Sequence, residues 1–242
     1  MSRNLQKNIA SKKQRKLIKD AKEVIAVELD EDAVEVIKKL NADNLKIIHN
    51  DILKVDLSLF GKNLKVVANI PYYITSPILA HLLGEIDDLN NENRNSIDEI
   101  ILMVQWEVAQ RLVANETSPS KQFGLLSILA QFYANVEILK KVPAKAFYPR
   151  PKVDSALVKL KVKKSPLLKL EDYTFFRKVI KASFLSRRKN IKNGLWNAGF
   201  DKNAVIKTLE ALNISENTRG EMLSIEQFGE ISKVLKENIC NK

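Results

Sequence analysis

Short runs of apolar and β-branched residues alternate with helical patterns along the first two thirds of the chain. The runs that predict buried strands are 24–27, 46–48, 64–70, 97–104, 136–142 and 156–162. Apolar residues spaced by three and four predict helices between them, over 107–114 and 125–135 and around Val34, Ile37 and Leu40. Ser76 and Pro77 predict a helix cap and a first helical residue. This alternation favours an α/β fold with a mostly parallel sheet, whose ligands bind at the carboxyl ends of the strands.

The strand pattern stops after residues 163–166, and from Glu171 onward the apolar spacing is helical. We therefore expect a basic N-terminal segment over 1–20, an α/β domain over 21–168 and a small all-α domain over 169–242. The acidic, Asn-rich stretch 87–96 is predicted to be a loop.

The positive charge is concentrated in two segments of the chain. The sequence has 40 Lys and Arg against 29 Asp and Glu, a formal net charge of +11. Residues 1–20 hold seven basic residues against one acid, and residues 177–192 hold seven and no acid, whereas residues 85–99 hold six acids against one Arg. Such patches are typical of a protein that binds a polyanion, and nucleic acid is the leading partner. A lysine-rich solvated surface is the alternative, and a membrane surface is disfavoured because 177–192 is not a long, clean amphipathic helix.

Several classes of site are excluded by composition. Cys240 is the single cysteine, which excludes a disulfide framework and a cysteine-ligated metal, so we expect a cytoplasmic protein without a metal. The apolar runs are too short to span a bilayer. No glycine precedes Gly61 and no two glycines lie within four residues, so neither a dinucleotide fingerprint nor a P-loop is present.

The residues Asn69, Ile70, Pro71 and Tyr72 follow a predicted strand and precede a predicted helix. Such a turn suits one chemical task, the activation of the exocyclic amine of adenine. This amine is a poor nucleophile because its lone pair is delocalised into the ring. Two acceptors, the Asn69 side-chain oxygen and the Ile70 carbonyl, would favour a localised lone pair. Pro71 would hold the turn rigid, and Tyr72 offers a face for a base to stack on, worth about 1–3 kcal/mol. The alternative is an ordinary strand-ending turn with a buried tyrosine.

The run from Asn69 to Ile78 resembles the signature of the ribosomal RNA adenine N6-dimethyltransferases, close to the bacterial small-subunit type. The blocks 27–30, 51–53, 105–111, 147–155, 184–189 and 219–224 are similar to further family motifs in the same order. The resemblance implies a Rossmann-like S-adenosylmethionine-dependent methyltransferase fold with a helical RNA-binding domain. It implies cofactor contacts for Glu28, Asp51, Ile52 and Asn69, catalysis by Asn69 to Tyr72, and a target base between Tyr72 and Phe147. RNA contacts are implied for Arg111, Lys152, Arg187, Arg188 and Lys189.

The chain departs from the family pattern at its N-terminal end. The family places a strand, a Gly-rich loop and a helix there, and the loop cradles the methionine end of the cofactor. Here 23 residues, none of them glycine, precede the strand at Val24, and a strand–loop–helix unit needs about 30. We therefore expect the sheet to lack its central first strand, which leaves the strand before Glu28 with an unpaired side. The simplest hypothesis is a truncated or internally deleted form.

The resemblance predicts N6,N6-dimethylation of adenines in 16S ribosomal RNA by a monomeric cytoplasmic enzyme that acts on the assembling small subunit, away from membranes. A non-catalytic RNA-binding factor for that subunit is the rival hypothesis, because it needs no glycine loop. An N6-adenine DNA methylase would share Asn-x-Pro-Tyr but would not explain the blocks in the helical domain.

Overall fold

The computed structural model describes residues 16–185 and 189–240. Its first unit is a small parallel sheet of β1 (Val24–Glu28) and β2 (Leu45–His49), joined by helix α2 (Glu31–Lys38). The Asp30 carboxylate caps α2 by accepting a hydrogen bond from the Ala33 amide at 3.0 Å. The Asn44 amide donates to the carbonyls of Ile18 and Ala21, which ties the helical residues 16–20 to the start of β2.

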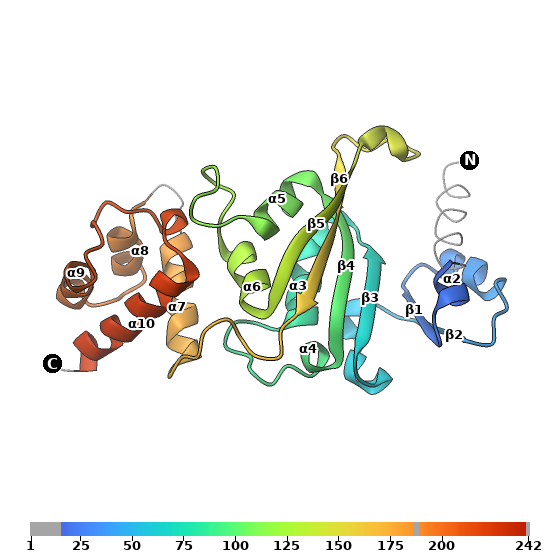
Figure 1. The fold of residues 1–242 in the computed structure, drawn as a ribbon, viewed down its shortest axis with the longest axis horizontal. Coiled ribbons are helices and arrows are strands. Elements are labelled where there is room, and N and C mark those ends of the chain that lie inside the picture. Colours follow the sequence, from blue (N-terminus) through green and yellow to red (C-terminus); the bar gives the residue numbers. More distant parts are fainter. Residues whose placement is uncertain (1–15, 186–188, 241–242) are drawn as a thin grey trace.

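A second sheet forms the middle of the molecule (Figure 1). Its order is β3-β4-β6-β5, with β3 spanning Leu64–Asn69, β4 Ile97–Gln105, β5 Ala134–Val142 and β6 Ser155–Val162. Strands β3 and β4 are parallel, but β6 is antiparallel to both β4 and β5. The expectation of a mostly parallel sheet is therefore wrong. Loop 143–154 joins β5 to β6 without a crossover helix, so the two neighbouring strands run in opposite directions.

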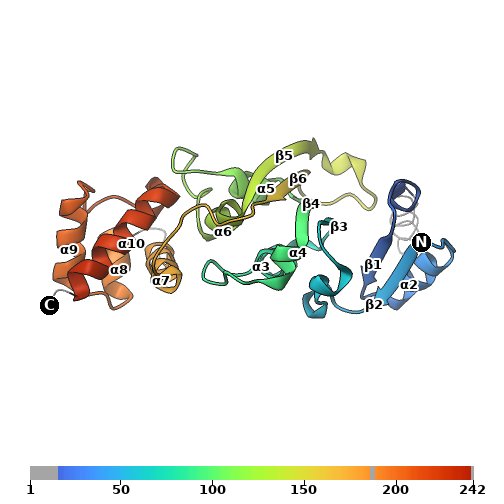
Figure 2. The same cartoon turned by 60° about the horizontal axis from the view of Figure 1, so that its bottom comes forward.

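The two sheets are separate units. Strand β3 is an edge strand of the larger sheet, and β1 belongs to the smaller one. The two strands do not pair with each other. Figures 1 and 2 both show the β1–β2 unit beside the β3 edge of the larger sheet. The prediction that the strand before Glu28 has an unpaired side is confirmed for residues 16–185 and 189–240, among which β1 pairs with β2 alone.

Helices α3 (Thr75–Leu83), α4 (Glu92–Ser96), α5 (Trp106–Val113) and α6 (Leu125–Tyr133) accompany the larger sheet. The predicted cap at Ser76 is wrong: α3 begins at Thr75 directly after a 3-10 turn, and the Thr75 hydroxyl bonds the Tyr72 carbonyl at 3.1 Å. The predicted loop at 87–96 contains α4, capped by the Asn91 side chain at the Arg94 amide. Short 3-10 helices span Ile52–Lys54, Leu57–Phe60, Tyr72–Ile74, Ala144–Ala146 and Gly220–Met222.

The C-terminal part is helical, as its spacing predicts, with α7 (Tyr173–Phe184), α8 (Ile191–Asn197), α9 (Lys202–Ala211) and α10 (Ile225–Cys240). Helix α7 packs on α6, where the rings of Phe132 and Phe176 lie 5.5 Å apart between centroids. Arg177 of α7 pairs with Glu85 at 2.8 Å and with Asp87 at 3.3 Å. The helices therefore share a core and ion pairs with the α/β part, and the division expected at residue 168 stays a prediction.

Candidate active site

The turn after β3 presents the Asn69 side chain to solvent. Asn69 is the last residue of β3 and is exposed, whereas Ile70 is buried with 7% of its surface accessible. The Ile74 amide donates to the Pro71 carbonyl at 3.1 Å, which closes the turn. The Ile70 side chain thus anchors in the core while the polar groups of the turn face outward. Within the described residues, the Asn69 side chain makes no hydrogen bond, so its amide oxygen is available to a ligand.

Two aromatic rings predicted to stack on a base, Tyr72 and Phe147, are each half-buried. The Tyr72 hydroxyl lies 2.7 Å from the hydroxyl of Ser155, the first residue of β6. Phe147 follows the 3-10 turn 144–146, and its amide donates to the Ala144 carbonyl at 3.2 Å. Hydrogen bonds thus hold the Tyr72 side chain and the backbone of Phe147, in segments that contact the chain at the start of β6.

Glu28 and Asp51 lie at neighbouring strand ends. Glu28 pairs in register with His49, and Asp51 follows two residues later. One Glu28 carboxylate oxygen accepts from the amides of Leu29 at 2.9 Å and Asp30 at 3.0 Å, and one Asp51 oxygen accepts from the Leu53 amide at 3.0 Å. Within the described part of the chain the second oxygen of each carboxylate accepts no hydrogen bond.

This arrangement fits the adenosine end of an S-adenosylmethionine-like cofactor and does not fit its amino-acid end. Each carboxylate keeps one oxygen that accepts no hydrogen bond from the described residues, which suits Glu28 to ribose hydroxyls and Asp51 to an adenine amine. Half-buried Ile52 lies beside Asp51. A cradle for a methionine group requires closely approaching backbone, but the first 60 residues contain no glycine. The structure brings Glu28, Asp51 and Ile52 together at one sheet, whereas Asn69 to Tyr72 end a strand of the other.

The residues predicted to contact RNA are spread over several elements. Arg111 forms an ion pair with Glu107, one helical turn away on α5. Lys152, in the loop before β6, and Lys189, before α8, are both exposed. Arg187 and Arg188 lie outside the described residues.

The basic segment around α7 is partly neutralised by acidic neighbours. Arg177 is bound by Glu85 and Asp87, and Lys192 by Glu216. Lys178, Lys181 and Lys189 are exposed and form no ion pair with described residues. These three lysines are the cations of the described segment that remain available to a polyanion.

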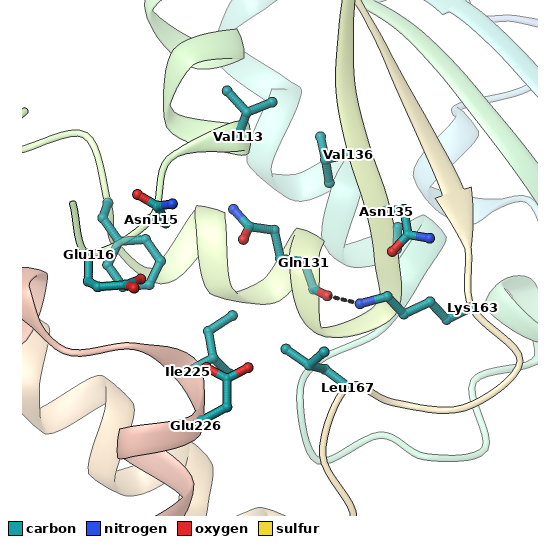
Figure 3. Close-up of a pocket in the computed structure, with 12 residues that line it drawn as sticks. Val113, Asn115, Glu116, Gln131, Asn135, Val136, Lys163, Leu167, Ile225 and Glu226 are labelled. Atoms are coloured by element: carbon teal, nitrogen blue, oxygen red, sulfur yellow. Dashed lines mark hydrogen bonds between the residues drawn. The ribbon is translucent and has the colours of Figure 1, made fainter. Parts of the chain in front are cut away.

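A pocket of about 420 Å³ lies elsewhere, between α6, the start of β5 and the start of α10 (Figure 3). The Lys163 amino group there donates to the Gln131 carbonyl at 2.6 Å, and burial lowers the pKa of Lys163. None of the predicted site residues lines this pocket. The candidate site is thus the open surface at the end of β3 and the start of β6.

In the described residues, no cluster of three or more His, Cys, Asp or Glu side chains is arranged to hold a metal ion. No described helix is both long and apolar enough to cross a bilayer.

Comparison with known proteins decides the family. Residues 12–237 match the family model described as ribosomal RNA adenine dimethylase. The chain belongs to this family. Members that resemble it include the ribosomal RNA small subunit methyltransferase A of Moorella thermoacetica, 38% identical over 88% of this chain and 75% of the relative. The enzyme of the same name from Clostridium perfringens strain SM101 is 37% identical over 93% of this chain and 77% of the relative.

Solved structures show the same fold. A dimethyladenosine transferase from Plasmodium falciparum superposes with a TM-score of 0.73 at 24% identity, over 98% of this chain and 87% of that one. The 23S rRNA methyltransferase ErmE superposes with a TM-score of 0.66 at 22% identity, over 92% and 86%. The Rossmann-like α/β fold class expected of the dimethylase family is therefore confirmed, with a mixed sheet and C-terminal helices.

The sequence does not point to Asp154 and Ser155 as functional residues. Both belong to the block 147–155 that resembles the family, yet Ser155 lies 83 residues from Tyr72, the residue whose hydroxyl it meets. The resemblance of block 147–155 to the family is the feature of the sequence that could draw attention to these two residues, but it does not predict the contact between Ser155 and Tyr72.

Proposed function

We propose that this chain catalyses S-adenosylmethionine-dependent N6,N6-dimethylation of adenines in small-subunit ribosomal RNA. The observation that carries the proposal is the Asn69–Tyr72 turn, whose uncommitted amide stands exposed at the end of β3 in a dimethylase-family chain. The named relatives act, by their names, on the small ribosomal subunit, which supports 16S RNA as the substrate.

In this proposal the turn binds and orients the target amine. The Asn69 amide oxygen and the Ile70 carbonyl accept hydrogen bonds from the two N–H groups, which favours a nitrogen lone pair directed away from the ring. The adenine ring lies between Tyr72 and Phe147, and unpaired adenines are favoured because they need not be extracted from a duplex.

The bound cofactor supplies a methyl group on a positively charged sulfur. Glu28, Asp51 and Ile52 would hold its adenosine end, and Asn69 would hold the target amine. No general base is required, because the methylated amine is cationic and releases its proton to solvent. The dimethyl product requires the Asn69–Tyr72 turn to accept an amine that already carries one methyl group.

The RNA backbone is proposed to lie along Arg111, Lys152, Lys189, Arg187 and Arg188, whose charges would hold phosphates in a salt-sensitive way. We place the reaction in the cytoplasm on the assembling small subunit, with the enzyme as a monomer. The excess of lysine and arginine, with its exposed share on α7 and before α8, supports a polyanionic substrate.

The deciding experiment incubates the purified chain with small-subunit RNA and particles and with methyl-labelled S-adenosylmethionine. Mass spectrometry of the digested nucleosides then measures N6-methyl- and N6,N6-dimethyladenosine. Both products are expected to accumulate with time. A folded chain that retains the RNA but forms neither nucleoside would overturn the enzymatic proposal and leave the function of an RNA-binding factor.

A further inference from the structure

Two adjacent residues at the start of β6 are linked to both of the aromatic segments. Ser155 is fully buried and stands opposite Gln105 of β4 and Val142 of β5, so three strands fix its backbone. Its hydroxyl meets the Tyr72 hydroxyl at 2.7 Å and makes no other hydrogen bond to the described residues. The position of the Tyr72 ring is thus tied to the centre of the sheet.

The preceding residue holds the other segment. One Asp154 carboxylate oxygen accepts from the Ala144 amide at 2.9 Å, and the other pairs with Lys141 at 3.1 Å. The Asp154 carbonyl accepts from the Trp106 amide at 2.9 Å, which fixes its backbone as well. Ala144 is the buried first residue of the 3-10 turn Ala144–Ala146, and Phe147 directly follows this turn. Asp154 therefore anchors the turn that carries the second ring.

From these contacts we propose that Asp154 and Ser155 are positioning residues that together set the separation of the Tyr72 and Phe147 rings. The inference rests on the proposed function, since it takes these rings as the two faces that hold the target base. Asp154 directly precedes Ser155, the first residue of β6, and the Trp106 amide bonds its carbonyl, so the two residues cannot move independently and the two rings keep a common reference. A hydroxyl pair at 2.7 Å is a normal O–H···O bond, and its loss leaves Tyr72 free to rotate.

The Ser155 half of the proposal is tested by a double-mutant cycle of Ser155→Ala and Tyr72→Phe. A hydrogen bond of ordinary strength predicts that each variant lowers kcat about three- to tenfold with little change in KM for RNA. The double variant is expected to match the single ones, because both remove the same bond. Effects that multiply, or a Ser155→Ala enzyme with normal kcat, would overturn the role.

The matched control is Ser96→Ala. Ser96 is also fully buried, and its hydroxyl donates to the Glu92 carbonyl at 2.9 Å in α4, in a segment without predicted site residues. The variant loses the same atom and an O–H···O bond, together with a longer bond that the Ser96 hydroxyl accepts from the Lys62 amino group at 3.3 Å. An equal loss of kcat in Ser96→Ala would show that the Ser155 effect is one of stability alone.

The Asp154 half uses a conservative and a disruptive variant. Asp154→Asn keeps an oxygen that accepts from the Ala144 amide and loses the charge that pairs with Lys141, whereas Asp154→Ala loses both. We expect Asn to stay within about twofold of the native kcat and Ala to lose about three- to tenfold. In a Phe147→Ala background the Ala change should have no further effect. A further loss there would contradict action through Phe147.

A readout without the cofactor separates this inference from the proposed function. A short unpaired RNA with 2-aminopurine in place of adenine loses fluorescence when that base stacks between rings. Quenching by the native chain that weakens in Ser155→Ala and Asp154→Ala, but not in Ser96→Ala, supports the positioning role even if no methyl is transferred. Methyl transfer with unchanged quenching in these variants overturns the positioning role alone. No quenching by the native chain overturns it as well.

Discussion

At the residue scale, adjacent residues of the turn after β3 have different roles in the candidate site. Ile70 is anchored in the core, so its neighbours Asn69 and Tyr72 hold fixed places on either side of it. Asn69 provides an exposed amide at a strand end, where its side chain is uncommitted within the described residues. The chemistry of these residue types was predictable from sequence, because it follows from adjacent positions. The bond between Tyr72 and Ser155 was not, because folding alone brings them together.

The first prediction concerns the amide. Asn69→Ala is expected to lower methyl transfer at least about 100-fold, because it removes a hydrogen-bond acceptor directed at the reacting amine. RNA affinity should change less than about twofold, since the Asn69 side chain is not charged. Nucleoside mass spectrometry and filter binding measure the two quantities. Asn135→Ala, an exposed asparagine in β5, is the control, and normal turnover in Asn69→Ala would contradict the role.

A second prediction concerns Tyr133, which is buried under the Arg94 guanidinium at 3.8 Å from the ring centre and donates to the Ile86 carbonyl at 2.7 Å. Burial raises the pKa of Tyr133 to about 12, from 10.0. The unfolded chain loses this proton first, so the stabilisation is complete below pH 10 and is lost as the pH rises towards 12.

The measurement compares the native chain with Tyr133→Phe in urea unfolding at pH 8 and pH 11. The native chain should lose about 1 kcal/mol relative to the variant between these two pH values. A constant difference in the free energy of unfolding would show that Tyr133 keeps an ordinary pKa in the folded state.

At the element scale, the apolar periods predicted most strands and helices, because each element buries one face and its spacing records that face. The division of the strands into two separate sheets was predicted because the sequence before Val24 is too short and lacks the glycines for a strand–loop–helix unit. Three features were missed. Helix α4 is short and polar, the cap of α3 is replaced by a continuous 3-10 turn, and β6 reverses direction after a long loop. Each depends on contacts between elements or on neighbouring turns rather than on the element's own pattern.

The divided sheet leads to a prediction about β3. No strand in the described part of the chain pairs with its outer edge, and Val67 on this strand is 49% exposed, which makes the strand a template for pairing with another chain. Val67→Lys is expected to slow aggregation during heating, measured by light scattering, with little change in Tm. The control is Val113→Lys, which adds the same charge at a 37% exposed valine of α5. Equal protection by both variants would attribute the effect to net charge alone.

At the scale of the whole molecule, the charge pattern of the sequence is rearranged by folding. The acidic stretch 85–99 and the basic stretch 177–192 are distant in sequence, but Arg177 joins them through Glu85 and Asp87. Part of the basic surplus thus stabilises the contact between α7 and the α/β part. Lys178, Lys181 and Lys189 keep their charges available at the surface.

This pattern predicts that RNA affinity falls steeply with salt and that Lys189 contributes to the slope. Neutralising one phosphate contact of a single strand changes the slope of log affinity against log salt by about 0.7. Lys189→Ala is expected to make the slope shallower by about this amount, whereas Lys46→Ala, an exposed lysine of β2, should leave it unchanged. Filter binding between low and high salt measures both, and equal slopes for native and Lys189→Ala would remove Lys189 from the interface.

The last prediction joins the two sheets. The described residues offer carboxylates for the adenosine end of the cofactor at β1 and β2, but they form no backbone cradle for its methionine end. Calorimetric titration should therefore give S-adenosylmethionine and methylthioadenosine, which lacks the amino-acid group, affinities within about threefold of each other. Glu28→Gln should weaken both equally, because the proposed contact of its carboxylate is with the nucleoside that the two ligands share. A preference for S-adenosylmethionine of tenfold, about 1.4 kcal/mol, would instead mean that this chain recognises the methionine group. Glu28 belongs to one sheet and Asn69 to the other. The same titration therefore tells whether the β1–β2 unit binds the nucleoside although it is not paired with the sheet that carries Asn69.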